Sequence, residues 1–485
     1  MPSRREFLKA ASLALAGWSA GSGFAALSAP NIDSQTTFKS CRPEPAKRTF
    51  RSEAIEAKIE EMKKFIADKE LAWLFENCFP NTLDTTVQHH GMLEGKLDTF
   101  IITGDIAAMW LRDSTAQVTP YIPLCKAEKK LANLIKGVIN RQTRCVLIDP
   151  YANAFNYDNR EPSRWHQDKT AMRNELHERK WEIDSLCYVI RLASLYWKAT
   201  GDASFMDKSW QTAMKTIYEV FREQQRLQND GSYRFRREFA AWYGDCVAND
   251  GLGLPTRKIG LIHSTFRPSD DACLFPFLIA SNFFAMVSLR QLAEMAEAEL
   301  NNPAFARNCR TFADELEHAL EQYAKREHLH YGPCYAFEID GYGNYYFMDD
   351  GNLPSLISLP YLGCLKANEP TYLNTRRFIL SEDNMYYFKG KAGEGYGGPH
   401  AGWEMIWHLG IIAVALTATS DDEIIKQLRL LKTTHAGTGF MHEAFHKDDA
   451  KRFTRAWFAW ANSLFGELIL KLHTERAYLL RRELY

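Results

Sequence analysis

Apolar residues recur at helical spacing along most of this chain. Such runs place apolar side chains at i, i+3, i+4 and i+7, the period of an α-helix with one buried face. Short stretches at 230–237 and 329–347 instead alternate in the manner of β-strands. The pattern predicts helices over residues 53–67, 180–199, 207–226, 270–300, 303–323, 402–418 and 455–473.

Short polar turns join several of these helical runs. The segments TGDASF at 200–205 and TSDDEI at 419–424 each end one run and carry capping residues for the next. No linker rich in Pro, Gly or Ser divides residues 51–485, so we expect them to form a single domain. Antiparallel helix pairs in a chain of 485 residues favour an all-α fold, a closed (α/α)6 barrel with short β-hairpin insertions.

The first residues are typical of a targeting segment. Arg4 and Arg5 form a twin-arginine motif that precedes the apolar run AASLALAG and a small-residue exit. We therefore expect a twin-arginine signal peptide over residues 1–29 and an N-terminal extension over residues 30–50. The mature protein is then periplasmic or secreted. The ten cysteines are scattered without a C-x-x-C pair, which predicts mainly core thiols.

Charge and composition limit the partners. A formal net charge of −1 argues against a dedicated nucleic-acid binder, because such a protein needs a basic face. Downstream of the N-terminal segment no apolar run is long enough to span a bilayer. We expect a monomer without nucleic-acid or membrane partners, acting on a neutral or weakly charged substrate. The sequence also lacks a P-loop, a dinucleotide fingerprint and a G-x-S-x-G elbow.

Segments rich in Gly, Trp, Asp and Arg lie between the predicted helices. If the helices form a ring, these segments can gather at one mouth of it. Aromatic rings beside carboxylates and arginines are typical of sugar recognition, because CH faces stack on the rings and hydroxyls pair with the charged groups. The candidate binding residues are Asp105, Trp110, Arg112, Asp113, Arg267, His400 and Trp403.

Two of these groups also have a purely structural interpretation. Arg112 could form a loop-stabilising ion pair with Asp105 or Asp113. The spacing of Trp403 and Trp407 fits the buried face of a helix, which would place both rings in the core.

The stretch His442-Glu443-Ala444-Phe445-His446 spells H-E-x-x-H. On a helix this motif binds zinc through both histidines, with the glutamate as general base and a third ligand elsewhere. The glycines of the preceding GTG and the following KDD are a poor helical frame, so a glutamate in a loop is the favoured interpretation. For His89-His90 and Asp349-Asp350 we expect hydrogen-bonded or solvated roles, since neither pair has ligand spacing.

Asp270 and Asp271 are adjacent carboxylates in RPSDDA, directly before an apolar run. One interpretation is an N-cap for the helix that follows. The other is chemical, because a carboxylate from this loop and Glu443 would make the pair that glycosidic cleavage needs. Both can hold if one aspartate caps while the other points into the ring.

Long stretches of the chain resemble family 125 of the glycoside hydrolases, the exo-acting α-1,6-mannosidases. The resemblance runs from about residue 50 to near the C-terminus, and it rests on ITGDIAAMWLRDSTAQVTPYIPL, RPSDDA, MDDGNLPSLISLPYLG, GGPHAGWEMIWHLGII and TGFMHEAFHKDDAKRFTRAWFAWANSLFGELI. It implies an (α/α)6 barrel and release of terminal α-1,6-linked mannose from the non-reducing end of mannosides or N-glycan fragments. It further implies inversion at the anomeric carbon, with neither metal nor cofactor.

Carried onto this sequence, the family's general base falls on Glu443 and its general acid on RPSDDA, with Asp270 favoured and Asp271 the alternative. An inverting mechanism needs room for a water, so the two carboxyl groups should stand roughly 6.5–9.5 Å apart. Three alternatives stay open: another inverting exo-glycosidase such as a glucosidase, a glycan-binding protein without turnover, and a zinc hydrolase using His442, Glu443 and His446.

Overall fold

Five helices are buried around most of their circumference and form an inner ring. This computed structural model describes residues 38–484. Every residue of the inner helices at Leu111–Val118 and His408–Thr417 is buried. A helix that is buried on all sides needs other elements packed around it. The five are α5 (Leu111–Val118), α7 (Ile183–Thr200), α10 (Ile279–Ala298), α13 (His408–Thr417) and α15 (Ala459–Glu475).

The inner helices follow one another around the ring in chain order. Helix α5 packs against α7, α7 against α10, and α13 against α15, which returns to α5. The turns at 353–363 come after α10 and before α13 in the chain, and they contact two other inner helices. The Tyr188 hydroxyl of α7 donates to the carbonyl of Leu353, and the Tyr361 hydroxyl donates to Glu467 of α15. These turns are therefore anchored to two of the inner helices.

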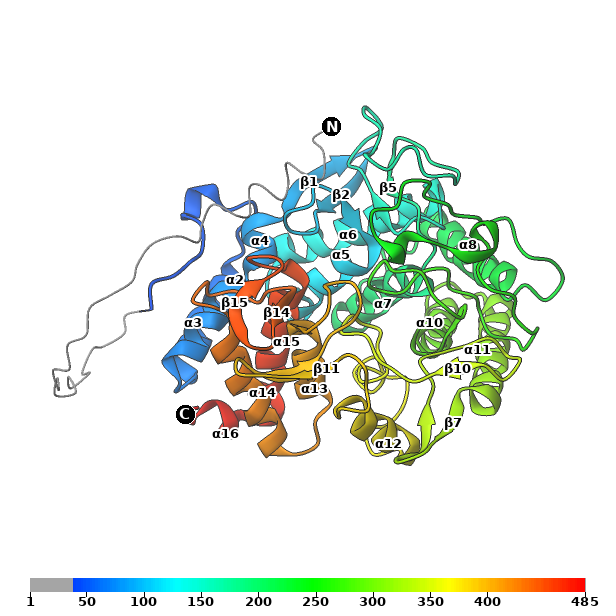
Figure 1. The fold of residues 1–485 in the computed structure, drawn as a ribbon. Coiled ribbons are helices and arrows are strands. Elements are labelled where there is room, and N and C mark those ends of the chain that lie inside the picture. The colour runs from blue at the N-terminus through cyan, green and yellow to red at the C-terminus, as the bar shows by residue number, and fades with distance from the viewer. Residues whose placement is uncertain (1–37, 485) are drawn as a thin grey trace, which may run out of the picture. The chain divides into compact units, whose positions relative to one another are not determined.

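Amphipathic helices cover the ring from outside. Helix α11 packs on α10, α14 on α13, and α6 on both α7 and α8; Figure 1 shows the first two pairs side by side. Side chains of Ser52, Asp68, Asp207, Asn302 and Ser420 accept backbone N–H bonds at the starts of α2, α3, α8, α11 and α14. The outer and shorter helices are α2 (Glu53–Phe65), α3 (Lys69–Cys78), α4 (Asn81–Thr85), α6 (Lys129–Ile148), α8 (Lys208–Gln224), α9 (Ala248–Gly251), α11 (Pro303–Tyr323), α12 (Pro370–Ile379), α14 (Asp421–Thr434) and α16 (Ala477–Leu480), with 3-10 turns η1 (Pro45–Lys47), η2 (Thr119–Leu124) and η3 (Tyr243–Asp245).

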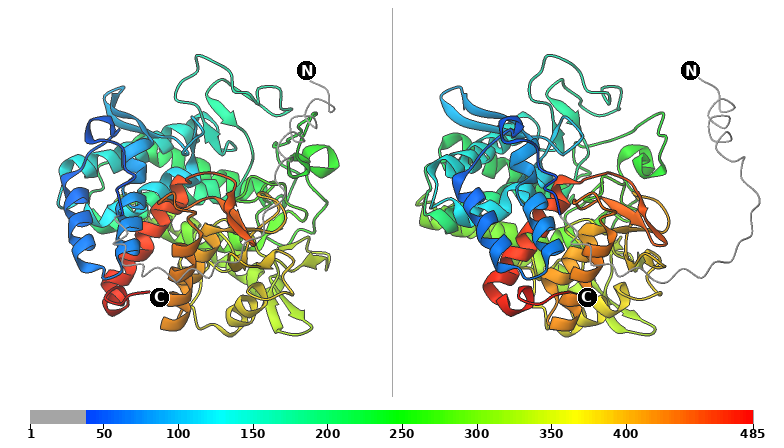
Figure 2. Two further views of the ribbon diagram at one scale, coloured as in Figure 1. Left: turned by 60° about the vertical axis from the view of Figure 1, so that its left-hand side comes forward. Right: turned by 90° about the vertical axis from the view of Figure 1, so that its left-hand side faces the viewer.

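Short antiparallel strands lead into the inner helices. Three sheets have three strands each, in the orders β3-β4-β5, β10-β9-β6 and β13-β14-β15. Their strands are β3 (Met109–Trp110), β4 (Ala154–Phe155), β5 (Leu176–Glu178), β6 (Phe277–Leu278), β9 (Glu338–Ile339), β10 (Tyr345–Tyr346), β13 (Met405–Trp407), β14 (Ala444–His446) and β15 (Asp449–Phe453). Strands β3, β6 and β13 run directly into α5, α10 and α13. Figure 2 shows β14 and β15, in orange-red, near the inner helices. Two-stranded hairpins are formed by β1 (Val87–Leu93) with β2 (Lys96–Ile101), β7 (Lys325–His328) with β8 (Gly332–Tyr335), and β11 (Tyr387–Lys389) with β12 (Glu394–Tyr396).

The predicted helices are present, and several begin later than expected. The run predicted at 270–300 becomes a loop, β6 and then α10, and the run at 402–418 becomes a turn, β13 and then α13. The stretch 230–237 forms no strand, only an isolated bridge from Arg236 to Lys169. None of the helices in the described range could cross a membrane. The predicted signal peptide lies outside the described residues.

Candidate active site

A polar cavity of about 210 Å³ lies where segments preceding the inner helices converge. It receives side chains from the start of α5, from the RPSDDA loop, from the loops around Asn352 and His400, and from the segment that runs from Glu443 into α15. Since the N-termini of α5 and α15 carry partial positive charge, carboxylates and a polar ligand are favoured here. The lining residues are Thr103, Asp105, Ile106, Trp110, Arg112, Asp113, Pro268, Ser269, Asp270, Asn352, His400, Trp407, Glu443, Arg455, Phe458 and Trp460.

Arg112 is the central cation of the cavity wall. Its Nη1 donates to Glu182 Oε2 at 2.6 Å and to Asp184 Oδ2 at 3.1 Å, while its Nη2 donates to Asp270 Oδ1 at 3.0 Å. The Nε atom lies 3.4 Å from Asp113 Oδ1. The expected ion pair of Arg112 is thus present as a buried cluster of four carboxyl groups, and Asp105 is not part of it.

Four carboxyl groups around one guanidinium cannot all be ionised without a large cost, so the cluster holds a proton. Burial raises the pKa of Glu182 well above its usual range, although Arg112 opposes the shift. Burial likewise raises the pKa values of Asp113 and Asp184 to about 6. For Asp270, burial is outweighed by the Arg112 charge, a hydrogen bond from Glu182 and the Lys180 charge, which hold its pKa below the usual range.

The two aspartates of RPSDDA point to different places. Asp270 lines the cavity, and its backbone φ of 68° lies in the left-handed region that non-glycine residues avoid. The Lys180 ammonium holds this conformation by donating to the Asp270 carbonyl at 2.7 Å. Asp271 does not line the cavity. Neither aspartate caps α10, whose N-cap is Leu278, so the capping interpretation is wrong.

Asp271 orients His400 at the cavity wall. Its Oδ1 atom lies 3.0 Å from His400 Nδ1 and accepts a second bond from Trp242 Nε1 at 2.9 Å. Burial opposes protonation of His400, but the hydrogen bond and charge of Asp271, with Glu443 and Asp270 nearby, raise its pKa to about 9. A charged imidazolium therefore faces the cavity at neutral pH.

Glu443 enters the cavity from another loop, directly before β14. Its Oε1 lies 3.5 Å from Arg455 Nη1, and the same guanidinium bonds Asp105 and the Thr103 carbonyl. Arg455 also lies over the Phe458 ring, 4.6 Å from its centroid. These contacts hold Glu443 at the cavity that Asp270 also lines.

The H-E-x-x-H stretch is not helical, so the geometry required for the zinc interpretation is missing. Ala444–His446 form strand β14, and the two histidines have unrelated partners. The His442 ring stacks on Phe453 at 4.0 Å, and its Nδ1 lies 2.9 Å from the Arg455 carbonyl oxygen. His446 Nε2 lies 3.3 Å from Glu404. The histidines pack and anchor the loop around Glu443.

The other two pairs weighed as metal ligands have hydrogen-bonded roles, as expected. Asp349 accepts the backbone N–H groups of Leu356 and Ile357 at 2.9 and 3.1 Å. His90 Nδ1 lies 3.0 Å from Thr99 Oγ1.

Two of the candidate binding residues lie away from the cavity. Arg267 is buried, and its guanidinium donates to Glu338 at 2.6 Å and to the Tyr346 hydroxyl at 2.5 Å, so it anchors the loop rather than lining the cavity. Trp403 is 67% exposed and lies on a turn. The prediction that Trp403 and Trp407 share a buried helix face is wrong, because the helix begins only at His408. Asp105, Trp110, Arg112, Asp113 and His400 do line the cavity.

Several buried donors lining the cavity are available to a ligand. Trp110 Nε1, Trp407 Nε1 and Ser269 Oγ are buried without a hydrogen-bond partner among residues 38–484. Unpaired buried donors are costly, so a bound molecule with many hydroxyl groups would recover this energy.

The match to a known family covers most of the chain. Residues 68–470 match the family described as metal-independent alpha-mannosidase, GH125. The chain belongs to glycoside hydrolase family 125. Its activity is therefore that of a glycoside hydrolase, an α-mannosidase.

Two relatives are similar to this family-125 enzyme over most of its length. A Schizosaccharomyces pombe protein named meiotically up-regulated gene 157 protein is 40% identical over 458 residues, which cover 91% of this chain and 90% of the relative. A Streptococcus pneumoniae family member, described as a metal-independent α-mannosidase in a non-productive complex with α-1,6-mannobiose, is 38% identical. That match has a TM-score of 0.84 and covers 88% of this chain and 100% of that one.

The (α/α)6 barrel prediction is confirmed. A family-78 rhamnosidase from Bacillus sp. GL1 shares the fold at 11% identity and a TM-score of 0.52, over 84% of this chain and 35% of that one. The likeness to that enzyme concerns the fold alone.

Several residues of the family-125 site were absent from the sequence-based prediction. Glu182, Asp184 and Asn153 surround Arg112 and Asp270, and Arg455 holds Glu443. A usable signal was present in KWEID at 180–184, where three charged residues introduce a helix that is otherwise strongly apolar. Charged groups at the start of a buried helix need partners.

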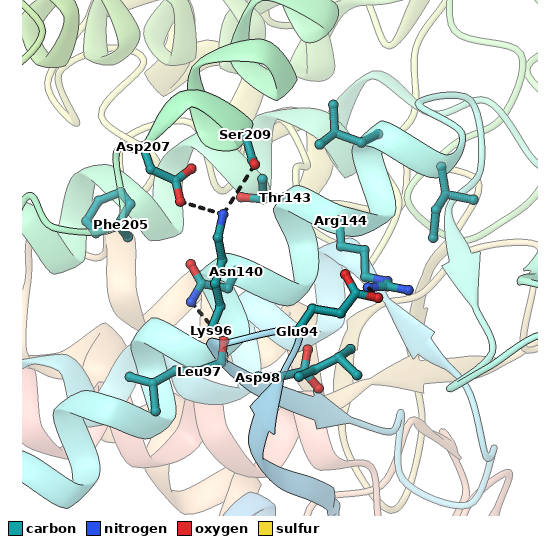
Figure 3. A pocket seen from close by; sticks show the side chains of 13 residues that line it. Glu94, Lys96, Leu97, Asp98, Asn140, Thr143, Arg144, Phe205, Asp207 and Ser209 are labelled. Carbon is teal, nitrogen blue, oxygen red and sulfur yellow. Dashed lines mark hydrogen bonds and ion pairs between the residues drawn. The ribbon is translucent and has the colours of Figure 1, made fainter.

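A second and larger depression, of about 400 Å³, lies between the β1–β2 hairpin, α6 and the start of α8. Figure 3 shows that its charged groups are engaged with one another: Lys96 reaches Asp207 and Ser209, and Arg144 pairs with Glu94 at 2.9 Å. The lining combines these ion pairs with apolar side chains, and it does not present a carboxylate pair comparable to Asp270 and Glu443.

Proposed function

We propose that this enzyme removes terminal α-1,6-linked mannose from the non-reducing end of mannosides or N-glycan fragments, with inversion at the anomeric carbon. The observation that carries the proposal is one small polar cavity into which Asp270 and Glu443 project from separate loops. Its volume of about 210 Å³ lies below the roughly 300–1,000 Å³ of pockets for drug-sized ligands, and such a size suits a single sugar unit. The α-1,6 linkage is supported by the mannobiose bound to the streptococcal relative.

In the proposed reaction Asp270 is the general acid. Its carboxyl proton moves to the glycosidic oxygen as the bond from that oxygen to C1 breaks, and the remaining mannoside leaves as an alcohol. Glu443 takes one proton from a water that attacks C1 from the opposite face. The product is β-mannose, and the two carboxyl groups exchange protons with solvent before the next turnover.

The acid step needs a protonated Asp270, which the Arg112 charge opposes. Glu182 resolves this conflict, because Arg112 and Asn153 bridge the two carboxyl groups and Glu182 retains a proton. Transfer of this proton from Glu182 to Asp270 protonates the carboxyl group that acts as the general acid. We assign Glu182 as a positioning residue that supplies the acid.

The remaining lining residues bind and orient the sugar. Asp113 and the His400 imidazolium present an acceptor and a donor, and Trp110, Trp407 and Trp460 supply ring faces and indole N–H groups. Asp105, paired with Arg455, closes the charged side of the cavity. In this proposal that side of the cavity is blocked, so only a terminal sugar unit can enter.

The direct test is a panel of α-1,2-, α-1,3- and α-1,6-linked mannobioses and α-1,6-linked glucobiose. Hydrolysis of the α-1,6-mannobiose with a kcat/KM at least tenfold above the others is expected. Preference for the glucoside would overturn the sugar assignment, and preference for another mannobiose would overturn the linkage. Export through the twin-arginine pathway, as the N-terminal motif suggests, is tested by fractionating cells with and without Arg4→Lys and Arg5→Lys.

A further inference from the structure

An oligomannoside cannot lie inside the cavity as a whole. A volume of about 210 Å³ accommodates one sugar unit, so the sugars on the leaving-group side must extend from the mouth. These sugars need a surface that packs against sugar rings without a hydrogen bond to every hydroxyl group.

Such a surface continues from the His400 side of the mouth. Asp271 Oδ1, which holds the His400 ring, also accepts the Trp242 indole N–H. The 237–246 loop is thereby tied to the cavity wall, and Tyr243 packs beside Trp242 with ring centroids 4.1 Å apart.

A second aromatic pair, Tyr386 and Trp403, lies on the chain segment that also contains His400. Tyr386 is joined to the segment before His400, because its carbonyl accepts the Gly397 N–H at 2.9 Å. Tyr386 lies 6.1 Å from the ring centroid of Trp403, and Phe388 lies 5.2 Å from Trp403 with its ring edge-on. We call Trp242, Tyr243, Tyr386 and Trp403 the aromatic ledge.

Two of the four ledge residues are largely open to solvent, and Trp242 and Tyr386 are half-buried. Trp403 is 67% and Tyr243 is 65% exposed. Clustered exposed aromatics usually mark a binding surface, because they gain free energy only when a ligand covers them. Phe388 and Tyr386 hold the Trp403 ring in place, which lowers the entropy lost on binding.

We propose that the aromatic ledge binds the leaving-group portion of the substrate, that is, the second and third sugar units of an α-1,6-linked oligomannoside. The inference rests on the proposed function, since it assumes that the terminal mannose occupies the cavity. The ledge then gives the enzyme a preference for chain length that the cavity alone does not provide.

The test compares two substrates that place the same mannose unit in the cavity and differ in their leaving group. α-1,6-Mannotriose spans the ledge, whereas α-mannosyl fluoride has a single atom as leaving group. Trp403→Ala and Tyr243→Ala should each lower the ratio of kcat/KM for mannotriose to that for the fluoride by about fivefold, the size expected of one aromatic contact. The loss should lie mainly in KM, and Trp403→Phe should recover most of it.

Tyr342→Ala is the matched control, because Tyr342 is also 65% exposed but lies on the turn between β9 and β10. Its ratio should equal that of the wild type. A second readout is binding of mannotriose and of mannose to the Glu443→Gln protein by calorimetry. Adding Trp403→Ala should weaken mannotriose about fivefold and mannose much less.

An unchanged substrate ratio in both Trp403→Ala and Tyr243→Ala would overturn the ledge while leaving the mannosidase proposal intact. Equal losses on both substrates would also overturn it, since they would mark a structural role. Absence of mannotriose turnover by the wild-type enzyme would instead refute the proposed function itself.

Discussion

Asp270 and Glu182 share two hydrogen-bond donors. The Arg112 guanidinium donates to Glu182 at 2.6 Å and to Asp270 at 3.0 Å, and the Asn153 amide reaches the same two carboxyl groups at 3.3 and 3.2 Å. Glu182 is fully buried, whereas the Asp270 side chain is 22% exposed at the cavity. Only Asp270 can therefore contact a substrate, and Glu182 acts through it.

Replacing Glu182 should move the basic limb of the pH profile of kcat/KM. That limb reports loss of the proton that the acid must donate. Glu182→Gln removes the carboxyl that retains this proton and leaves Asp270 beside Arg112, so the limb should shift to lower pH by about one unit or more. The measurement is kcat/KM for α-1,6-mannobiose between pH 4 and 9.

Glu182→Asp serves as the conservative control and should keep part of the wild-type profile, since it retains a carboxyl group. A Glu182→Gln enzyme with lower activity but an unshifted limb would show that Glu182 only supports the fold around Arg112.

Asp270 and Asp271 should be distinguishable by leaving group. Asp270→Asn should lower kcat for mannobiose by about 10²–10⁴-fold, the usual contribution of a general acid. It should cost far less on α-mannosyl fluoride, because fluoride departs without needing a proton. Asp271→Asn disturbs His400 and should affect both substrates alike. The opposite pattern would move the acid role to Asp271.

Glu443→Gln should lower kcat for mannobiose and for α-mannosyl fluoride by a similar factor, about 10²–10⁴-fold. The base activates water in either reaction, so the leaving group cannot compensate for its loss. Thermal unfolding should be close to wild type, since among residues 38–484 the Glu443 carboxylate pairs with Arg455 alone, at 3.5 Å. A fluoride reaction that survives in Glu443→Gln would refute the assignment of the base.

The helices were largely predictable and the mouth of the barrel was not. Buried helices such as α10 repeat apolar residues over many turns, which the helical period detects. The short apolar strands β6 and β13 precede α10 and α13 without a break, so the same pattern merged them with the helices. The alternative interpretation of Trp403 as a core residue arose for this reason, but Trp403 is exposed on the turn before β13.

The site was predictable where function depends on residue type within one segment. Asp105, Trp110, Arg112 and Asp113 come from a single motif, and all line the cavity. Glu182 lies 70 residues from its partner Arg112, a distance that local pattern cannot bridge. The orientation of Asp270 depends on a left-handed backbone fixed by Lys180, which also leaves no trace in local sequence.

The pair of His400 and Asp271 should stabilise the fold in a defined pH range. The pKa of His400 is raised to about 9 in the folded protein, from about 6.5 when unfolded. The contribution is therefore complete below about pH 6.5 and is lost as the pH rises through about 9. The Tm of wild type should exceed that of His400→Gln most at pH 6, with the difference shrinking toward pH 9.5. A difference that grows with pH would contradict the pairing.

The central claim is metal-independent inversion at C1 with Glu443 as the base. Proton NMR of α-1,6-mannobiose with the EDTA-dialysed enzyme tests it, by following the anomer of the first mannose released and using Glu443→Gln as control. The account predicts that β-mannose accumulates first and that the control releases it more slowly by about 10²-fold or more. Early α-mannose, or turnover only after zinc is restored, would contradict it.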